Sequence, residues 1–90
     1  MDNFAIEPAR QGIYPAVCHI GQIYVPLTDE GLAQLRAAAT VPPKEFYRIL
    51  VEVAGASAYL RELIERVWAQ GDAAEQTRRL QQAIAQLPAR

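Results

Sequence analysis

The chain has 90 residues and a formal net charge of -1 at pH 7, a length that fits one small domain covering residues 1–90. The near-neutral charge argues against a general binder of nucleic acids or anionic membranes, because both need a basic protein surface. Cys18 and His19 are the only cysteine and the only histidine, so no internal disulfide can form, and we expect no metal site and no cofactor. A domain of this size then depends on helix packing or self-association for its stability.

The first twelve residues show only weak patterning. Phe4 and Ile6 alternate with polar neighbours before Pro8 and Gly12 interrupt the run. We expect residues 1–12 to form an extended arm, with a short edge strand as the alternative.

No segment of the sequence suits a membrane span or a secretory signal. Residues 1–6 include the acidic Asp2 and lack the apolar run of a signal peptide. The longest stretch without Asp, Glu, Lys or Arg covers residues 11–28, and Pro15 and Pro26 within it exclude a membrane helix. We therefore expect a cytoplasmic protein with no membrane partner. Eight arginines against one lysine, with abundant alanine, suit a bacterial or phage gene of high GC content.

Residues 13–27 are predicted to form a β-hairpin. The turn is placed at Gly21-Gln22, because a type II′ turn favours glycine at its first central position. This register puts six side chains on the buried face, in the cross-strand pairs Ile20–Ile23, Cys18–Val25 and Ala16–Leu27. The opposite face carries Val17, His19, Tyr24 and Pro26. His19 is interpreted as an ordinary surface residue opposite Tyr24.

A first helix is predicted over residues 29–39. Thr28 is a suitable N-cap, and Asp29 lies in the first turn, where the helix dipole favours negative charge. Pro42 disfavours helical geometry at the residue before it, and Pro43 suits the first turn of a following helix.

The stretch Pro43–Gln70 is the most strongly patterned part of the chain. Its apolar residues follow an unbroken a/d repeat over more than three heptads: Phe46, Ile49, Val53, Ala56, Leu60, Leu63 and Val67. The small residues around Gly55 allow either a break into two shorter helices or one continuous helix. Because the heptad phase is the same on both sides of Gly55, we favour one long helix, in which an interior glycine costs only about 1 kcal/mol relative to alanine. In that arrangement Gly55→Ala would be neutral or stabilising.

A last helix is predicted over residues 73–87. Gly71 suits the end of the preceding helix, Asp72 suits an N-cap, and Glu75 stands where a capping box has its acid. The short connection implies that this helix folds back antiparallel on the second half of the long one. The predicted fold is therefore α+β and mostly α, with an N-terminal β-hairpin followed by three helices in residues 28–90, the middle helix being long.

The sequence contains no recognisable catalytic or metal-binding motif. Adjacent residues in a strand point to opposite faces, so Cys18 and His19 cannot act as a catalytic pair. Glu45 and Glu52 lie on one helix face but two turns apart, so nothing pairs them for acid–base chemistry. No glycine-rich phosphate loop, GxSxG or HExxH pattern occurs. We therefore expect a non-enzymatic protein, with a small helical enzyme that lacks a motif as the third-ranked alternative.

The helices on either side of residues 40–42 resemble a helix-turn-helix, which gives a dimeric DNA-binding regulator as the alternative function. The pattern departs from that motif at Arg36, where a small residue is usual, and at Thr40, where glycine is usual. The second helix offers only Lys44 and Arg48 as bases, so nucleic acid is not the expected partner. Apolar residues do stand where the motif requires them, at Leu35, Ala39, Phe46 and Ile49.

The long helix carries a second apolar stripe outside the a/d seam. A helix that is apolar on two sides is either central in a core or part of an interface. We take the stripe as the candidate interface of a homodimer, with coverage by the first helix and the hairpin as the alternative. Its residues are Tyr47, Val51, Ala54, Gly55 and Ala58.

The predicted function is accordingly that of a small interaction or regulatory protein, which works as a homodimer or by capping another protein. Arg78 and Arg79 diverge by about 100° around their helix, and Glu75 is placed to neutralise Arg79. We therefore favour a solvated helix face for them, with contact to phosphates or an acidic partner as the alternative. The candidate polar contacts to a partner are Lys44, Arg48, Arg78 and Arg79.

Overall fold

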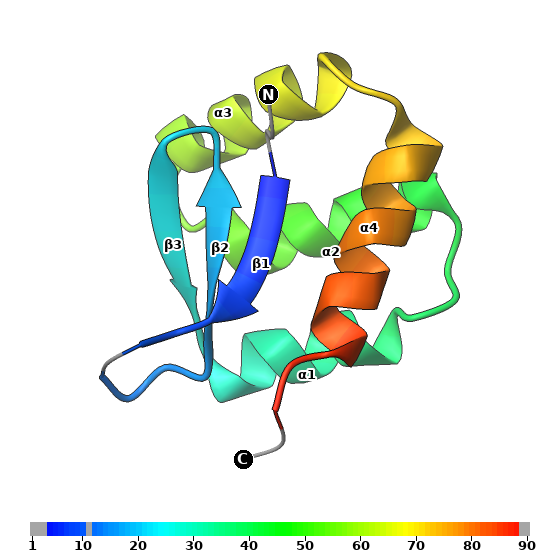
Figure 1. The fold of residues 1–90 in the computed structure, drawn as a ribbon. Helices are drawn as coiled ribbons and strands as arrows, with labels where there is room; N and C mark the ends of the chain where they lie inside the picture. The colour runs from blue at the N-terminus through cyan, green and yellow to red at the C-terminus, as the bar shows by residue number, and fades with distance from the viewer. Residues whose placement is uncertain (1–3, 11, 89–90) are drawn as a thin grey trace.

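An antiparallel sheet is followed by helices in the computed structural model, which describes residues 4–10 and 12–88. The strands are β1 (Phe4–Pro8), β2 (Ala16–Ile20) and β3 (Ile23–Leu27), in the order β1-β2-β3. The helices are α1 (Asp29–Ala37), α2 (Pro43–Ala54), α3 (Ala58–Ala69) and α4 (Ala73–Ala85) (Figure 1). The α+β class is confirmed, but the described residues form four helices rather than the predicted three.

The predicted N-terminal arm contains an edge strand, β1. Ala5 of this strand lies opposite His19 of β2, and Glu7 lies opposite Val17. β1 therefore adds the third strand that a two-stranded ribbon needs for independent stability. Residues 1–3 and 11 of the arm lie outside the described residues.

The β2–β3 hairpin has the predicted register, with Ile20 opposite Ile23, Cys18 opposite Val25, and Ala16 opposite Leu27. Gly21 has a φ of 60°, and no non-glycine residue in the described ranges has a positive φ, which is the pattern of a type II′ turn. Of the six side chains predicted to be buried, four are buried, Val25 is partly buried, and Ile23 is 36% exposed. Ile23 stands at the turn end of an edge strand, where fewer neighbours can cover it.

Thr28 caps α1 as predicted, because its Oγ1 accepts a hydrogen bond of 3.0 Å from the Gly31 N–H. The helix ends two residues earlier than predicted. Beyond its end, Nε2 of Gln81 in α4 donates to the carbonyl oxygens of Ala38 at 2.9 Å and Val41 at 3.2 Å. One side chain thus bonds a carbonyl at the end of α1 and another in the α1–α2 connection, and it ties α4 to that connection.

The predicted single helix over residues 43–70 is wrong, because the chain breaks between α2 and α3. Gly55 has φ -97° and ψ 61°, outside the helical region. Ser57 is the N-cap of α3, and its Oγ accepts a hydrogen bond of 3.1 Å from the Leu60 N–H. The guanidinium of Arg61 donates to the Gly55 carbonyl oxygen at 3.0 Å. Local hydrogen bonds therefore satisfy both ends of the break, which the heptad phase did not reveal.

The residues that α2 buries also differ from the predicted a/d seam. α2 buries Phe46, Leu50 and Ala54, at a spacing of four. Ile49 and Val53 of the seam are only partly buried. A helix with many apolar residues supports more than one stripe, and the packing of the other elements selects the one that is buried.

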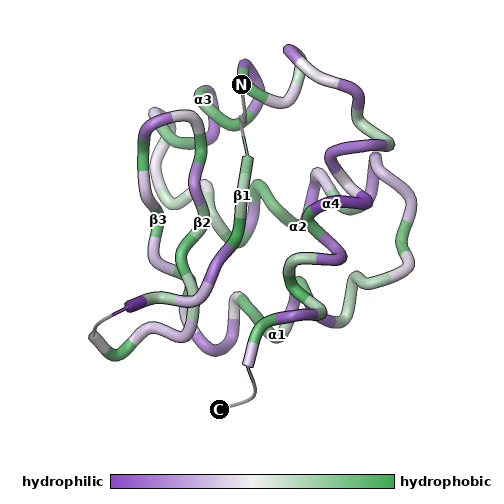
Figure 2. Tube along the Cα trace, viewed as in Figure 1, coloured by the Kyte–Doolittle hydropathy of each residue, from purple (hydrophilic) through white to green (hydrophobic). Residues whose placement is uncertain are grey.

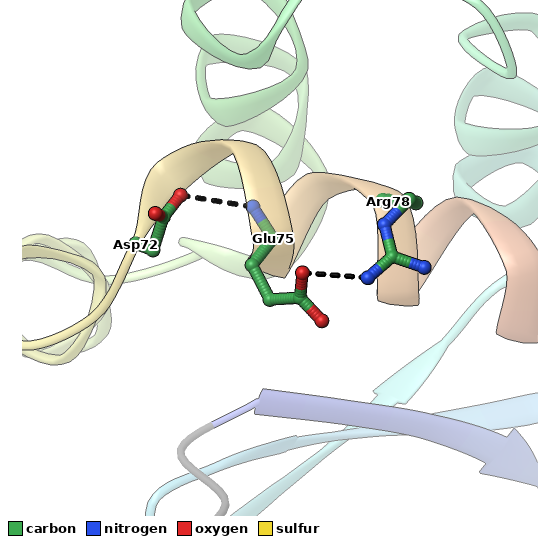
Figure 3. Close-up of polar contacts among 3 residues, drawn as sticks. All are labelled: Asp72, Glu75 and Arg78. Atoms are coloured by element: carbon green, nitrogen blue, oxygen red, sulfur yellow. Dashed lines mark hydrogen bonds and ion pairs between the residues drawn. The ribbon is translucent and has the colours of Figure 1, made fainter.

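The last helix begins at the predicted N-cap, since Oδ1 of Asp72 accepts a hydrogen bond of 3.0 Å from the Glu75 N–H (Figure 3). It does not fold back along α3 as predicted. α4 runs from the end of α3 towards α1 at a steep angle to α3 (Figure 1), and it packs mainly against β1, α2 and α1. Burial of the apolar side of α4 against the sheet and the first two helices thus replaces the predicted packing along α3.

The core lies between the inner face of the sheet and the helices. Hydrophobic residues recur along α2, whereas hydrophilic residues prevail along α4 (Figure 2). Each large apolar side chain that is fully buried contributes about 1.5–3 kcal/mol. The largest fully buried side chains are Phe46, Ile20, Leu27, Leu35, Leu50 and Ile64.

In the part of the chain that the structure describes, none of the helices has the length and apolar character needed to cross a membrane.

Gly55→Ala is expected to destabilise the fold, contrary to the expectation from a continuous helix. A Cβ at position 55 would stand 2.5 Å from the Val51 carbonyl oxygen and 2.6 Å from Cγ of Arg61. The first of these atoms belongs to the backbone of α2 and cannot easily move aside. Overpacking of this kind costs about 1–3 kcal/mol, so urea denaturation followed by circular dichroism should show a lower midpoint at an unchanged slope.

Ser57→Ala provides a second variant at the same break. In a continuous helix, alanine would be more favourable than serine, whereas loss of an N-cap costs about 1 kcal/mol. Thr28→Ala removes the matched cap of α1 and should lower the free energy of unfolding by a similar amount. A Ser57→Ala protein that is more stable than the wild type would contradict the break.

Candidate functional site

The two faces of the sheet differ in what covers them. On the inner face, Phe4, Ile6 and Cys18 belong to the hydrophobic core that the helices complete. On the outer face, Tyr24 is 66% exposed, and His19 is partly buried. The outer face therefore presents side chains to solvent, and we consider it the candidate binding surface.

A hollow of about 450 Å³ lies over this face, within the size range of ligand pockets. The central strand β2 contributes Val17 and His19 to it, and β3 contributes Tyr24. The connection between β1 and β2 contributes Arg10 and Tyr14. Side chains from three segments of the chain therefore meet here, and we call this site the outer-face hollow.

His19 has the closest side-chain contacts in the outer-face hollow. Its Nε2 lies 2.9 Å from Oε2 of Glu7, and its ring centroid lies 4.2 Å from that of Tyr24 at an interplanar angle of 49°. Nε2 is buried and forms no hydrogen bond with any described residue. Its contact with Glu7 is short but is not aligned as a hydrogen bond. The carboxylate of Glu7 and the ring of Tyr24 therefore both contact the imidazole.

Two exposed tyrosines and one cation also line the hollow. Tyr14, in the β1–β2 connection, is 39% exposed, and Tyr24 comes from β3. Both side chains offer an apolar ring with a polar hydroxyl at its tip. Arg10 is exposed and makes no ion pair with any residue in the described ranges. The hollow thus combines aromatic surface with hydrogen-bond donors.

Cys18 points away from the outer-face hollow. Its side chain is fully buried on the inner face of the sheet, and burial raises the pKa of the thiol to about 12. A thiol held in its protonated form is a poor nucleophile. Among the described residues, no group of three or more His, Cys, Asp or Glu side chains is arranged to hold a metal ion.

The structure separates the residues of the predicted helical interface. Ala54 and Gly55 are buried within the chain, whereas Ala58 is exposed. Tyr47 packs against Trp68, with ring centroids 5.3 Å apart, and burial together with the Glu65 carboxylate raises the pKa of its hydroxyl. Val51 remains partly exposed and lines a shallow groove between α2 and α3 together with Tyr47.

The predicted polar contacts lie on two different helices. Lys44 and Arg48 are on α2, where Arg48 pairs with Glu52 at 3.6 Å. On α4, Arg78 pairs with Glu75 at 2.5 Å (Figure 3). These four bases therefore do not form one cluster. Arg79 lines a groove between β1 and α4, together with residues 4–6, Leu80 and Ala83.

The sequence signalled only part of the outer-face hollow. Strand alternation placed His19 and Tyr24 on one face and opposite each other, as the structure confirms. Glu7, Arg10 and Tyr14 were missed, because they reach the site only through the pairing of β1 with β2 and the path of the connection between them. The weak alternation of Phe4 and Ile6 allowed a short edge strand, but it did not indicate which strand this would pair with.

In comparisons with known protein families, curated proteins and solved structures, nothing matches this chain.

Thiol labelling tests the assignment of the two sheet faces. Cys18 should react slowly with an aromatic disulfide reagent at pH 8 until denaturant is added, because it is buried and protonated. In a Cys18→Ala background, Val17→Cys should react at the rate of an accessible thiol, since neighbouring strand residues point to opposite faces. Fast labelling of native Cys18 would mean that the faces are reversed.

Proposed function

We propose that this chain is a non-enzymatic protein-binding domain and that the outer-face hollow is its binding surface. The observation that carries the proposal is the pair of exposed rings, Tyr14 and Tyr24, which line the outer-face hollow together with His19. Tyrosine is enriched in protein interfaces because it supplies a large, rigid apolar area together with a polar tip. A second protein covering this face would bury rings that the fold itself leaves exposed.

Binding is favoured over catalysis by the composition of the site. The contact of Glu7 with His19 could orient an imidazole as a general base. However, no Ser, Thr or Cys side chain lies among the described residues that line the outer-face hollow, and Cys18 faces the core. A site with a candidate general base but no side-chain nucleophile among its described lining residues is better suited to recognition than to covalent catalysis.

Peptides displayed on phage offer a test that needs no known partner. Peptides selected on the wild-type protein should shift the backbone amide resonances of Val17 and Tyr24 in NMR spectra. Tyr24→Ala should weaken their binding by more than about tenfold, as expected for an exposed aromatic anchor. Tyr59→Ala, which truncates an exposed tyrosine of α3, is the matched control and should leave affinity unchanged. Equal losses in both variants, or peptides that bind elsewhere, would count against the proposal.

Self-association through α2 and α3 is the second candidate function. The groove between these helices has Tyr47 and Val51 among its lining residues. A surface that combines apolar side chains with charges of both signs suits pairing with a second copy about a twofold axis. The charged lining residues are Arg48, Glu52, Arg61, Glu62 and Glu65.

Val51→Glu tests this second candidate. If the groove pairs two copies, the substitution should place like charges near the axis and convert dimer to monomer, while the helical signal in circular dichroism is largely kept. Sedimentation equilibrium at micromolar concentration gives the mass, and Ala74→Glu on the exposed surface of α4 is the matched control. A wild type with the mass of one chain would rule out this candidate, and a Val51→Glu dimer would place the interface elsewhere.

The charges on α2 do not favour the alternative of a DNA-binding regulator. In a helix-turn-helix, α2 would be the recognition helix. Its exposed charges are Lys44, Glu45, Arg48 and Glu52, as many acids as bases. Such a surface supplies little of the phosphate neutralisation on which affinity for DNA depends.

A further inference from the structure

We propose that the outer-face hollow binds a proline-rich segment of a partner protein, held in the polyproline II conformation, with an acidic residue next to the prolines. This inference rests on the proposed function and names the class of partner. It follows from the aromatic rings and hydrogen-bond donors of the site, from the small number of backbone groups that the sheet edges offer, and from the charges that line the hollow.

The side chains of the hollow suit proline rings. Tyr14 and Tyr24 are exposed and come from different segments, and the ring of His19 lies between Glu7 and Tyr24. Proline-rich ligands dock on aromatic-lined grooves, because their preformed helix loses little conformational entropy on binding. Both tyrosine hydroxyls can donate hydrogen bonds, as can the guanidinium of Arg10. A run of prolines offers carbonyl acceptors and no N–H group, so it matches a site of donors.

The edges of the sheet are less suited to a partner in the β conformation. Alternate residues of β3 pair with β2, so only Tyr24 and Pro26 turn their backbone groups outward. Pro26 has no N–H, which leaves the N–H of Tyr24 as the one outward donor of β3. At the other edge, α4 packs against β1, whose Phe4 and Ile6 are buried. A partner therefore gains more contact from the face of the sheet than from either edge.

The charged side chains that line the hollow favour an acidic ligand residue next to the prolines. Glu7 already lies 2.9 Å from Nε2 of His19. Arg10 is exposed and has no ion-pair partner within residues 4–10 and 12–88. An acidic residue in the ligand would find an open guanidinium, which binds carboxylates well. A basic residue would instead meet the carboxylate that faces His19.

The direct test titrates the ¹⁵N-labelled protein with a blocked peptide of two aspartates followed by six prolines. Amide shifts should gather at Val17, His19 and Tyr24, with saturation in the micromolar to millimolar range. Exchanging the aspartates for lysines should weaken binding about two- to fivefold, the range for an exposed ion pair. A peptide with alternating glycine and serine in place of the prolines should not bind.

Variants of the site sharpen the test. Tyr24→Ala should weaken binding of the aspartate–proline peptide by more than about tenfold, whereas Tyr59→Ala should leave it unchanged. Both tyrosines are largely exposed, so the indole resonance of Trp68 should confirm an intact core in each variant. Arg10→Glu should reverse the preference, so that the lysine–proline peptide binds more tightly than the aspartate–proline peptide.

Two outcomes would overturn the inference: no shifts in the outer-face hollow at millimolar aspartate–proline peptide, or equal binding of the glycine–serine peptide. Its failure can be told apart from failure of the proposed function. If phage-selected peptides without proline bind at Val17 and Tyr24 while the proline peptides do not, the ligand class is wrong and the binding surface stands. If neither kind of peptide contacts these residues, both proposals fail.

Discussion

The central strand β2 is the constraint on which the rest of the structure depends. It has to pair with β1 and β3 at the same time, while its side chains alternate between two faces. Ala16, Cys18 and Ile20 are fully buried beneath the helices, and Val17 and His19 consequently turn outward. A register shift of one residue would exchange the two sets and would bury the imidazole in the core. One strand therefore places both the hydrophobic core and the candidate binding surface.

Both edges of the sheet are protected, but by different means. β3 contains Pro26, which removes an outward N–H, and β1 is covered by α4. A small sheet whose edges resist pairing is protected against growth by strand addition, which would otherwise lead to aggregation. Recognition of a partner is then better served by side chains on the face, and this is where Tyr14 and Tyr24 are exposed. The protected edges that oppose the addition of a further strand thus also favour binding of a partner on the face of the sheet.

The break between α2 and α3 shows how local chemistry can outweigh a long-range pattern. The heptad phase continues across Gly55, yet it reflects an apolar composition that supports several stripes. The stronger signals were Gly55 itself and Ser57, which is an N-cap residue at the start of α3. Arg61 then completes the break by donating to the Gly55 carbonyl. Small and capping residues within an apolar run therefore indicate a helix break more strongly than an unbroken heptad phase indicates a continuous helix. The reason is that serine hydrogen-bonds to nearby backbone groups in non-helical conformations and so favours caps and turns.

The sequence by itself determined the hairpin register and the N-caps Thr28 and Asp72, because turn and capping chemistry acts over two to four residues. Only the tertiary structure decided the direction of α4 and the group that gathers around His19. These depend on contacts between distant segments, such as the hydrogen bonds from Gln81 to carbonyls 43 and 40 residues earlier in the chain. Glu7, Arg10 and Tyr14 join the site in the same way, through pairing of β1 with β2. Local sequence patterns do not predict such contacts, because the contacts stabilise the fold only after distant elements have packed together.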